Sequence, residues 1–369
     1  MKKNREQIQA EALDITDGHR RCSIELSMGV GKTLVGLQYI DSLYNVDIQV
    51  CIAIPKLSIK DTWLSEMDKH GYSHLKDQVF FTTYLSLGKQ DADFFDILIL
   101  DECHNLTEAH RSWLDKYTGL ILGLSGTMPK YHHSEKGKMI ADFCPTVYRY
   151  STDEAVGDDI LNDYRIIVHE MELSPKKDLW HKSKNGSGWY TSERSEYEYW
   201  TGRVHRSTTP REQQIMRVMR MKSLMNFKTK EVYAKKLFES IEDKSIIFCN
   251  TQDQAKLMCS ESYFSKNPDN KENLRKFKEG EINKLSAVQM LSEGVNIPDL
   301  KQAIIMHSFS GSSPKSKQKL GRILRLNPNE IAIMHMLVYK DCMDESWLNS
   351  VLEGFDAEKI SYKGKAVVT

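Results

Sequence analysis

Apolar residues in the first half of the chain gather in short, nearly continuous runs, separated by segments with helical spacing. These runs lie at 21–26, 48–55, 78–84, 96–100 and 119–124. A short run that is apolar at almost every position is typical of a strand buried on both faces, as in a parallel sheet. Between the first two runs, Leu34, Val35, Leu37 and Ile40 follow helical spacing. Strands that alternate with helices predict a doubly wound, mostly parallel α/β sheet.

The second half repeats this alternation and predicts a second α/β domain. Its apolar runs lie at 164–169, 244–250, 287–291, 302–307 and 331–339. Residues 151–163 are acidic and predict a hinge between the halves. We therefore expect four parts: an N-terminal domain (1–150), a hinge (151–164), a C-terminal domain (165–345) and a C-terminal helix and tail (346–369). The tail around Lys363 is expected to be disordered.

Composition narrows the class of protein. The 369 residues are enough for two domains. Because 51 Lys and Arg balance 51 Asp and Glu, any attraction to nucleic acid must come from local patches. Seven scattered cysteines without a Cys-x-x-Cys pair favour reduced thiols in a cytoplasmic compartment over a zinc module. No signal peptide is predicted, and no apolar run approaches the roughly 18 residues that a membrane span needs.

A glycine-rich segment follows the first predicted strand and precedes a predicted helix. It reads Leu26-Ser27-Met28-Gly29-Val30-Gly31-Lys32-Thr33. Glycines let the backbone wrap closely around a phosphate, and the amides of Met28, Gly29, Val30 and Gly31 are the expected donors. Lys32 would neutralise the β- and γ-phosphates, and the Thr33 hydroxyl would ligate Mg²⁺. The alternative is an ordinary glycine-rich turn from a strand to a helix.

Two acidic residues follow a buried strand about 70 residues later. Asp101 can hold Mg²⁺, and Glu102 can orient and deprotonate a water that attacks a γ-phosphate. Ser125 and Thr127 follow the next predicted strand. Ligands of parallel sheets bind beyond the carboxyl ends of the strands. The glycine-rich segment, the acidic pair and Ser125-Gly126-Thr127 all fall at such ends. The alternative for the acidic pair is a solvated turn.

Other segments supply weaker candidates. Gln7, upstream of the glycine-rich segment, could read an adenine edge, or it could be a solvent-exposed helical residue. Residues 180–206 interleave aromatic and basic side chains, Trp189 and Trp200 among them, and the ten Lys or Arg between 203 and 236 face only two acids. Aromatic rings can stack on bases while cations pair with phosphates. The alternatives are a small insertion with its own core and a solvated basic helix face.

Arg322 and Arg325 are three residues apart and so share one helical face. Two guanidinium groups held together suit the stabilisation of charge on a transferring phosphoryl group. Two surface arginines are the alternative.

In order, these motifs resemble the nucleotide-site motifs of the DExH group of superfamily 2 helicases and translocases, and the size resembles compact phage or bacterial members. The resemblance implies two tandem RecA-like domains, each a mostly parallel sheet flanked by helices, with ATP in the cleft between them. It implies Gln318, Arg322 and Arg325 as catalytic residues, Gly294 as a nucleotide contact, and coupling through Ser125 and Thr127. It also implies nucleic-acid contacts by Pro55, Lys56, Thr82, Thr83, Tyr84, Ser292 and Asn296. Leu26 departs from the family pattern, which has glycine there.

The sequence therefore predicts an ATP- and Mg²⁺-dependent helicase or translocase that acts on DNA, monomeric in isolation. An RNA helicase, or an ATP-driven clamp that remodels protein–nucleic acid complexes without separating strands, remains open.

Overall fold

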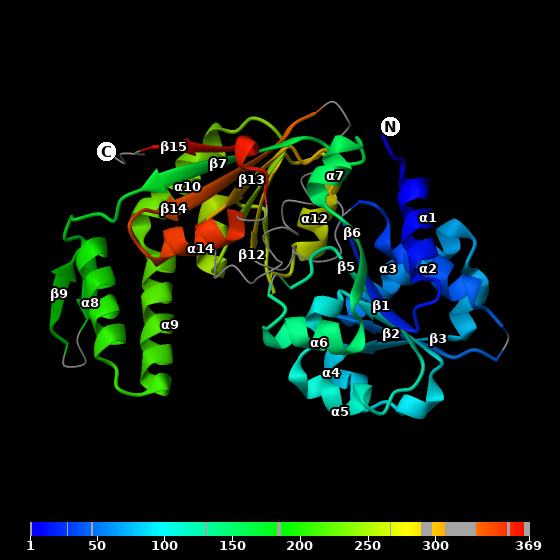
Figure 1. Cartoon of the computed structure of the whole chain (residues 1–369). Coiled ribbons are helices and arrows are strands. Elements are labelled where there is room, and N and C mark those ends of the chain that lie inside the picture. Colours follow the sequence, from blue (N-terminus) through cyan, green and yellow to red (C-terminus); the bar gives the residue numbers. More distant parts are fainter. Residues whose placement is uncertain are drawn as a thin grey trace. The chain divides into compact units, whose positions relative to one another are not determined.

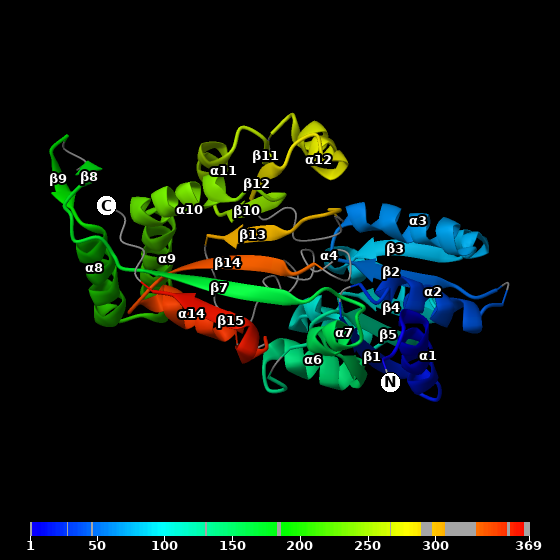
Figure 2. The ribbon, with the colours of Figure 1, turned by 90° about the horizontal axis from the view of Figure 1, so that it is seen from above.

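A computed structural model describes residues 2–27, 29–45, 47–129, 131–182, 186–265, 267–288, 297–306, 330–352 and 355–364. This part of the chain divides into two compact units. The N-terminal unit runs to Asp163, and the C-terminal unit begins at Tyr164. Each unit is built around one parallel sheet (Figure 1, Figure 2).

The N-terminal unit contains a six-stranded parallel sheet in the order β3-β2-β4-β5-β1-β6. Its strands are β1 Arg21–Leu26, β2 Val50–Ile54, β3 Val79–Thr83, β4 Ile97–Asp101, β5 Leu120–Ser125 and β6 Thr146–Tyr150. Every residue of β2 and β4 is buried, which is why these strands read as continuous apolar runs.

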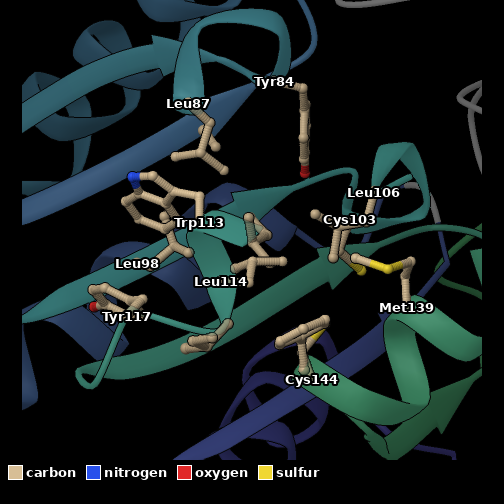
Figure 3. Close-up of a cluster of buried hydrophobic side chains, with 14 of the residues drawn as sticks. Tyr84, Leu87, Leu98, Cys103, Leu106, Trp113, Leu114, Tyr117, Met139 and Cys144 are labelled. Carbon is tan, nitrogen blue, oxygen red and sulfur yellow. The ribbon is translucent and has the colours of Figure 1, made fainter. Parts of the chain in front are cut away.

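Helices cover both faces of this sheet. They are α1 Arg5–Thr16, α2 Lys32–Ser42, α3 Lys60–His70, α4 Tyr84–Leu87, α5 Arg111–Leu114, α6 Glu135–Phe143 and α7 Thr152–Gly157. Helices α1, α2 and α3 lie on one face, and α4, α5 and α6 lie on the other (Figure 1). On the latter face, Trp113 and Tyr117 stack at 5.3 Å in a core that also contains Cys103 and Cys144 (Figure 3).

The strand order determines which strand ends are neighbours. Strand β5 pairs with β1 on one side and with β4 on the other. The chain after β5 therefore emerges between the glycine-rich segment that follows β1 and the acidic pair at the end of β4. On the far side of β4, Ile54 of β2 is in register with Thr83 of β3, so the segments that follow these two strands are also neighbours.

The C-terminal unit contains a seven-stranded parallel sheet in the order β11-β12-β10-β13-β14-β7-β15. Its strands are β7 Tyr164–Met171, β10 Ser245–Cys249, β11 Ser262–Tyr263, β12 Lys284–Val288, β13 Gln302–Ile305, β14 Ala332–Tyr339 and β15 Ile360–Lys363. The helices of this layered part are α10 Lys228–Ser240, α11 Gln252–Met258, α12 Asn270–Glu279 and α14 Met343–Leu352. The prediction of two mostly parallel sheets flanked by helices is confirmed.

An insertion leaves this sheet after β7 and returns at α10. It consists of an antiparallel hairpin, β8 Leu179–Lys182 and β9 Gly188–Thr191, followed by helices α8 Glu193–Arg206 and α9 Pro210–Asn226. The two helices lie side by side at one end of the C-terminal sheet (Figure 1, Figure 2). Thr209 caps α9, and Pro210 occupies its first turn, where a missing N–H costs nothing.

Hydrogen bonds and ion pairs of buried charged side chains connect the insertion and the helices beside it to the sheet. The carboxylate of Glu193 accepts hydrogen bonds from the Ser174 amide at 3.1 Å and from the Thr229 amide at 2.9 Å. Lys230 of α10 is fully buried and pairs with Asp344 of α14, and Asp344 also accepts the Tyr339 amide at 2.9 Å. Because an unpaired charge is costly in the interior, these partners hold α8, α10 and α14 in register with β14.

Two segments contain elements that the sequence did not predict. The acidic stretch after Tyr150 includes a capped helix, α7, in which Ser151 and Glu154 form a capping box and Ala155 is buried. The residues before the expected tail form β15, which pairs with β7 from Ile360 to Lys363, and the end of the tail, from residue 365, lies outside the described residues. The residues of β15 are mostly polar, so the sequence shows no apolar run there. The strand forms because its pairing satisfies the backbone hydrogen-bonding groups along the outer edge of β7.

Among the described helices, none is long and apolar enough to cross a membrane. All seven cysteines are free thiols.

A chain of hydrogen bonds joins two buried histidines in the C-terminal sheet. His169 lies 2.7 Å from the Tyr233 hydroxyl and 2.9 Å from His335, measured between the bonded atoms. His335 lies 3.0 Å from the side-chain oxygen of Gln302. Burial lowers the pKa of His169 to about 4 and that of His335 to about 3. Both imidazoles are therefore neutral in the folded state at neutral pH.

We expect the stability of the C-terminal unit to fall as the pH is lowered from 6.5 towards 4. In that range the unfolded histidines take up protons and the buried ones do not, so protonation favours unfolding. Replacing both His169 and His335 by Gln should flatten this dependence, measured as urea unfolding midpoints at neutral and acidic pH. The exposed His205→Gln serves as the control. An equally steep loss of stability in the double variant would contradict the assignment.

Candidate active site

The glycine-rich segment forms a tight turn that only glycine accommodates at two positions. Gly29 has a φ of 93° and Gly31 a φ of 98°, both in the left-handed region. A Cβ on Gly29 would lie 2.8 Å from a methyl carbon of Leu161, and one on Gly31 would lie 2.7 Å from Nε2 of Gln9. Gly31 caps α2, which begins at Lys32. The first amides of α2 and its dipole therefore favour an anion at this turn.

A glutamine that the sequence did not single out contacts this turn. Nε2 of the buried Gln9 donates to the Val30 carbonyl at 2.6 Å. The expected adenine-reading residue, Gln7, is exposed and completes the cap of α1, where its side-chain oxygen accepts the Asn4 amide at 2.9 Å. Gln9 lies beside Ile8 and Ala12 on the buried face of α1. A polar residue on an otherwise apolar face was the signal that could have identified it.

The Asp101 carboxylate lies at the end of β4 and is nearly buried, with 9% of the residue exposed. Burial and the adjacent negative charge of Glu102 raise the pKa of Asp101 to about 6. A hydrogen bond from the indole of Trp63, at 3.0 Å, and the positive charge of Lys32 oppose this rise in pKa. Asp101 is therefore a buried carboxylate that faces a lysine of the glycine-rich turn.

Glu102 is the first residue beyond β4 and has a left-handed backbone, with a φ of 55°. Its Oε2 lies 3.3 Å from Oγ of Ser125 and 3.4 Å from Nδ1 of His104. Ser125 Oγ also accepts the Thr127 amide at 3.1 Å. The structure thus brings Glu102, Ser125 and Thr127 into one hydrogen-bonded cluster. The Thr127 hydroxyl is buried and has no hydrogen-bond partner among the described residues.

The side chains present at this sheet edge fit a nucleotide with Mg²⁺. Mg²⁺ prefers oxygen ligands and is usually bound by one or two protein oxygens together with phosphates and waters. Asp101 and Thr33 provide such oxygens, Thr33 being half-buried in the first turn of α2. When bound, Mg²⁺ would neutralise charge on the phosphates, and Lys32 would do the same from the turn.

The two segments expected to contact nucleic acid lie at the same edge of the sheet, beyond β2 and β3. Lys56 is exposed, and Pro55 and Thr83 are half-buried. Thr82 and Tyr84 differ from the expectation, because their side chains are 4% and 6% exposed and turn into the core. The residue after them, Leu85, is 93% exposed.

The aromatic residues of the insertion differ in how far they are exposed to solvent. Trp189 is exposed and stacks on His181 at 5.6 Å, whereas Trp200 is half-buried against Tyr199. Trp180 and Tyr190 form a second exposed pair, with ring centroids 4.9 Å apart. The pairing register of β8 and β9 places these two aromatic pairs on opposite faces of the hairpin.

Some predicted site residues lie outside the described part of the chain. They are Met28, Ser292, Gly294, Asn296, Gln318, Arg322 and Arg325.

Two family models match the chain. A model described as the res subunit of type III restriction enzymes matches residues 2–130, and a model of the helicase conserved C-terminal domain matches residues 228–327. The DNA 3'-5' translocase XPB2 of Sulfurisphaera tokodaii is 23% identical over 358 residues, which cover 89% of this chain and 80% of the relative.

Solved structures share the fold at low identity. The type ISP restriction-modification enzyme LlaBIII bound to DNA superposes with a TM-score of 0.60 and 14% identity over 98% of this chain. This chain spans about a third of that enzyme, 31% of its length. The Pyrococcus furiosus Hef helicase domain has a TM-score of 0.51 and 15% identity, covering 94% of this chain and 97% of that one. S. cerevisiae Dbp5 bound to RNA and ADP BeF3 has a TM-score of 0.56 and 13% identity, covering 97% and 89%.

We predict that Glu102→Gln retains ATP binding and loses ATP hydrolysis by about a hundredfold or more, the usual contribution of a general base. The amide preserves the size of the side chain and cannot take a proton from water. The measurement pairs nucleotide affinity with single-turnover hydrolysis, and Glu108→Gln, on the exposed surface, is the control. Hydrolysis at the rate of the control would contradict the role of Glu102.

Proposed function

Because the chain belongs to the superfamily 2 helicases and translocases, whose members hydrolyse ATP, we propose that it uses ATP hydrolysis to move along DNA as a monomer. The observation that carries this proposal is the convergence of Lys32, Asp101 and Glu102 at one sheet edge, beside the exposed segment around Lys56. An ATP site and a strand-binding surface supported by the same sheet are what an ATP-driven motor requires.

In the proposed site the residues have separate tasks. The amides of the turn and Lys32 hold the phosphates, and Thr33 and Asp101 hold Mg²⁺. Glu102 orients the attacking water, and Ser125 fixes the position of the Glu102 carboxylate. Arg322 and Arg325, with Gln318 near them in sequence, are proposed to stabilise charge on the γ-phosphate, and Gly294 to contact the nucleotide.

The proposed nucleic-acid surface of the N-terminal unit includes Lys56, Thr83 and the exposed Leu57 and Leu85. Lys56 would pair with a phosphate, and apolar side chains would contact sugars or bases, as is common for single strands. Thr82 and Tyr84 are 4% and 6% exposed, so we propose that they support this surface from below rather than contact a strand themselves. Ser292 and Asn296 are proposed as contacts from the second half of the chain.

DNA is the proposed substrate because the relatives favour it. XPB2 is described as a DNA translocase, and the LlaBIII structure contains DNA. The Dbp5 structure contains RNA, so an RNA helicase is the second candidate. A clamp that remodels protein–nucleic acid complexes without separating strands is the third.

The hairpin β8–β9 is the proposed strand-separating element. It exposes flat aromatic faces on both sides, and basic residues of α8 and α9 follow it, among them Arg203, Arg206 and Arg211. An aromatic ring can take the place of a neighbouring base when a pair is opened, and stacking contributes about 1–3 kcal/mol per base. Trp200, half-buried against Tyr199, would support the helix rather than contact the bases.

We predict that nucleic acid stimulates ATP hydrolysis several-fold and that duplex or branched DNA does so more than RNA. The measurement compares steady-state ATPase rates on single-stranded, duplex and branched DNA and on the matching RNAs. The stimulation should weaken as salt is raised, because phosphate contacts release counterions. A rate that no nucleic acid changes would contradict the proposed function, whereas preference for RNA would favour the second candidate.

We also predict that Trp180→Ala and Trp189→Ala reduce the separation of forked DNA while ATP hydrolysis continues. Loss of a stacking face removes the capture of opened bases and leaves the ATP site intact. Tyr362→Ala, an exposed aromatic on β15, is the matched control. Unwinding at the control rate in both variants would exclude the hairpin as the separating element. Translocation without unwinding, even in the unaltered protein, would favour the clamp.

A further inference from the structure

Two buried side chains form hydrogen bonds to Asp101, and each comes from a helix that follows a proposed nucleic-acid segment along the chain. The indole of Trp63 donates to the Asp101 carboxylate at 3.0 Å, and the hydroxyl of Tyr84 donates to the Asp101 carbonyl at 2.9 Å. Trp63 is on α3, beyond β2 and Lys56, and Tyr84 begins α4, beyond β3 and Thr83. Both bonds are buried.

Trp63 also connects Asp101 to the helix that follows the glycine-rich turn. Its ring is fully buried and lies so close to Gly36 of α2 that a Cβ there would be 2.8 Å from a ring carbon. The indole therefore touches the helix that begins with Lys32 while its N–H orients the carboxylate. A displacement of α3 would alter both contacts, because a close-packed interior transmits small shifts.

Tyr84 is fixed from several sides. Its ring packs edge-on against His110 at 5.7 Å, and its carbonyl oxygen lies 3.1 Å from Nε2 of the same histidine. Burial raises the pKa of Tyr84 well above its ordinary value, so the hydroxyl stays protonated and remains a donor. The next residue, Leu85, is 93% exposed. The exposed Leu85 is thus the direct chain neighbour of Tyr84, whose hydroxyl is hydrogen-bonded to the Asp101 carbonyl.

We propose that Trp63 and Tyr84 are positioning residues that transmit nucleic-acid contact at Lys56 and Leu85 to the Asp101 carboxylate. A strand bound at these exposed positions shifts the start of α3 and α4 and thereby sets where the Asp101 oxygens lie for Mg²⁺. The inference rests on the proposed function, in which nucleic acid binds at this surface. It gives the buried Trp63 and Tyr84 a role that requires contact with neither the nucleotide nor the strand.

The test uses two substitutions that remove one hydrogen-bond donor each and keep an aromatic side chain. Trp63→Phe removes the indole N–H, and Tyr84→Phe removes the hydroxyl. The N-terminal unit offers matched controls: Trp113 donates to the Gln90 carbonyl at 2.8 Å and Tyr117 donates to the Leu120 carbonyl at 3.1 Å, both in the same core. Trp113→Phe and Tyr117→Phe make the same two substitutions at residues that form no hydrogen bond to Asp101.

The first readout is the affinity for a fluorescent ATP analogue with Mg²⁺ and with a chelator in its place. Trp63→Phe should weaken binding about tenfold with Mg²⁺, the scale of one hydrogen bond to a charged group, and leave binding in the chelator unchanged. A structural defect would weaken both equally. Equal loss in both conditions, or no loss in either, would overturn the role of Trp63.

The second readout is the ratio of nucleic-acid-stimulated to basal ATP hydrolysis, measured beside strand affinity. Tyr84→Phe should lower this ratio to a small fraction of that in Tyr117→Phe, with strand affinity equal in the two variants. A ratio like that of Tyr117→Phe would overturn the role of Tyr84. If nucleic acid does not stimulate ATP hydrolysis by the unaltered protein, the proposed function is contradicted. In that case the comparison of nucleotide affinity with and without Mg²⁺ still tests whether Trp63 positions Asp101.

Discussion

The N-terminal unit depends on the placement of a carboxylate at the end of a fully buried strand. Residues Ile97–Leu100 make β4 part of the core, and Asp101 ends it with a group that prefers to be ionised in water. Burial opposes that charge, and the indole of Trp63 and the ammonium of Lys32 favour it. A carboxylate held in this way has little freedom to move, which suits the role in Mg²⁺ binding that we propose for it.

The position of β5 between β1 and β4 brings the segment after β5 into contact with both of these strands. Because β5 separates β1 from β4, Ser125 reaches Glu102, while the Met128 amide reaches Glu25 of β1 at 3.0 Å. The glycine-rich turn and the acidic pair are therefore joined through the segment between them. The Thr127 hydroxyl, which has no hydrogen-bond partner in the described part of the chain, lies in this segment.

The C-terminal unit uses buried polar groups for another purpose. Lys230 and Asp344 fix the helices that surround the insertion, and the histidine chain spans three neighbouring strands. Neither network contains a residue proposed for ATP chemistry. The Lys230–Asp344 pair joins α10, which follows the insertion, to α14, and the proposed strand-separating hairpin would need such a rigid base.

Much of the fold was predictable because strands buried on both faces leave an unmistakable apolar run. The strands that end at Leu26, Asp101 and Ser125 were recognised in this way, and the site residues at their ends followed. Gln9 and Trp63 were not assigned to the site, and Tyr84 was expected to contact nucleic acid rather than Asp101, because these placements depend on which face is buried and on distant partners. Strand β15 was missed because an edge strand can be polar.

If the turn that begins after Leu26 binds the phosphates of ATP, its lysine is essential for hydrolysis. The most direct measurement is steady-state ATP hydrolysis by Lys32→Ala beside the exposed control Lys138→Ala, both with saturating DNA. We expect no measurable turnover in Lys32→Ala and full turnover in the control, as this role of the turn requires. Turnover by Lys32→Ala at the rate of the control would contradict it.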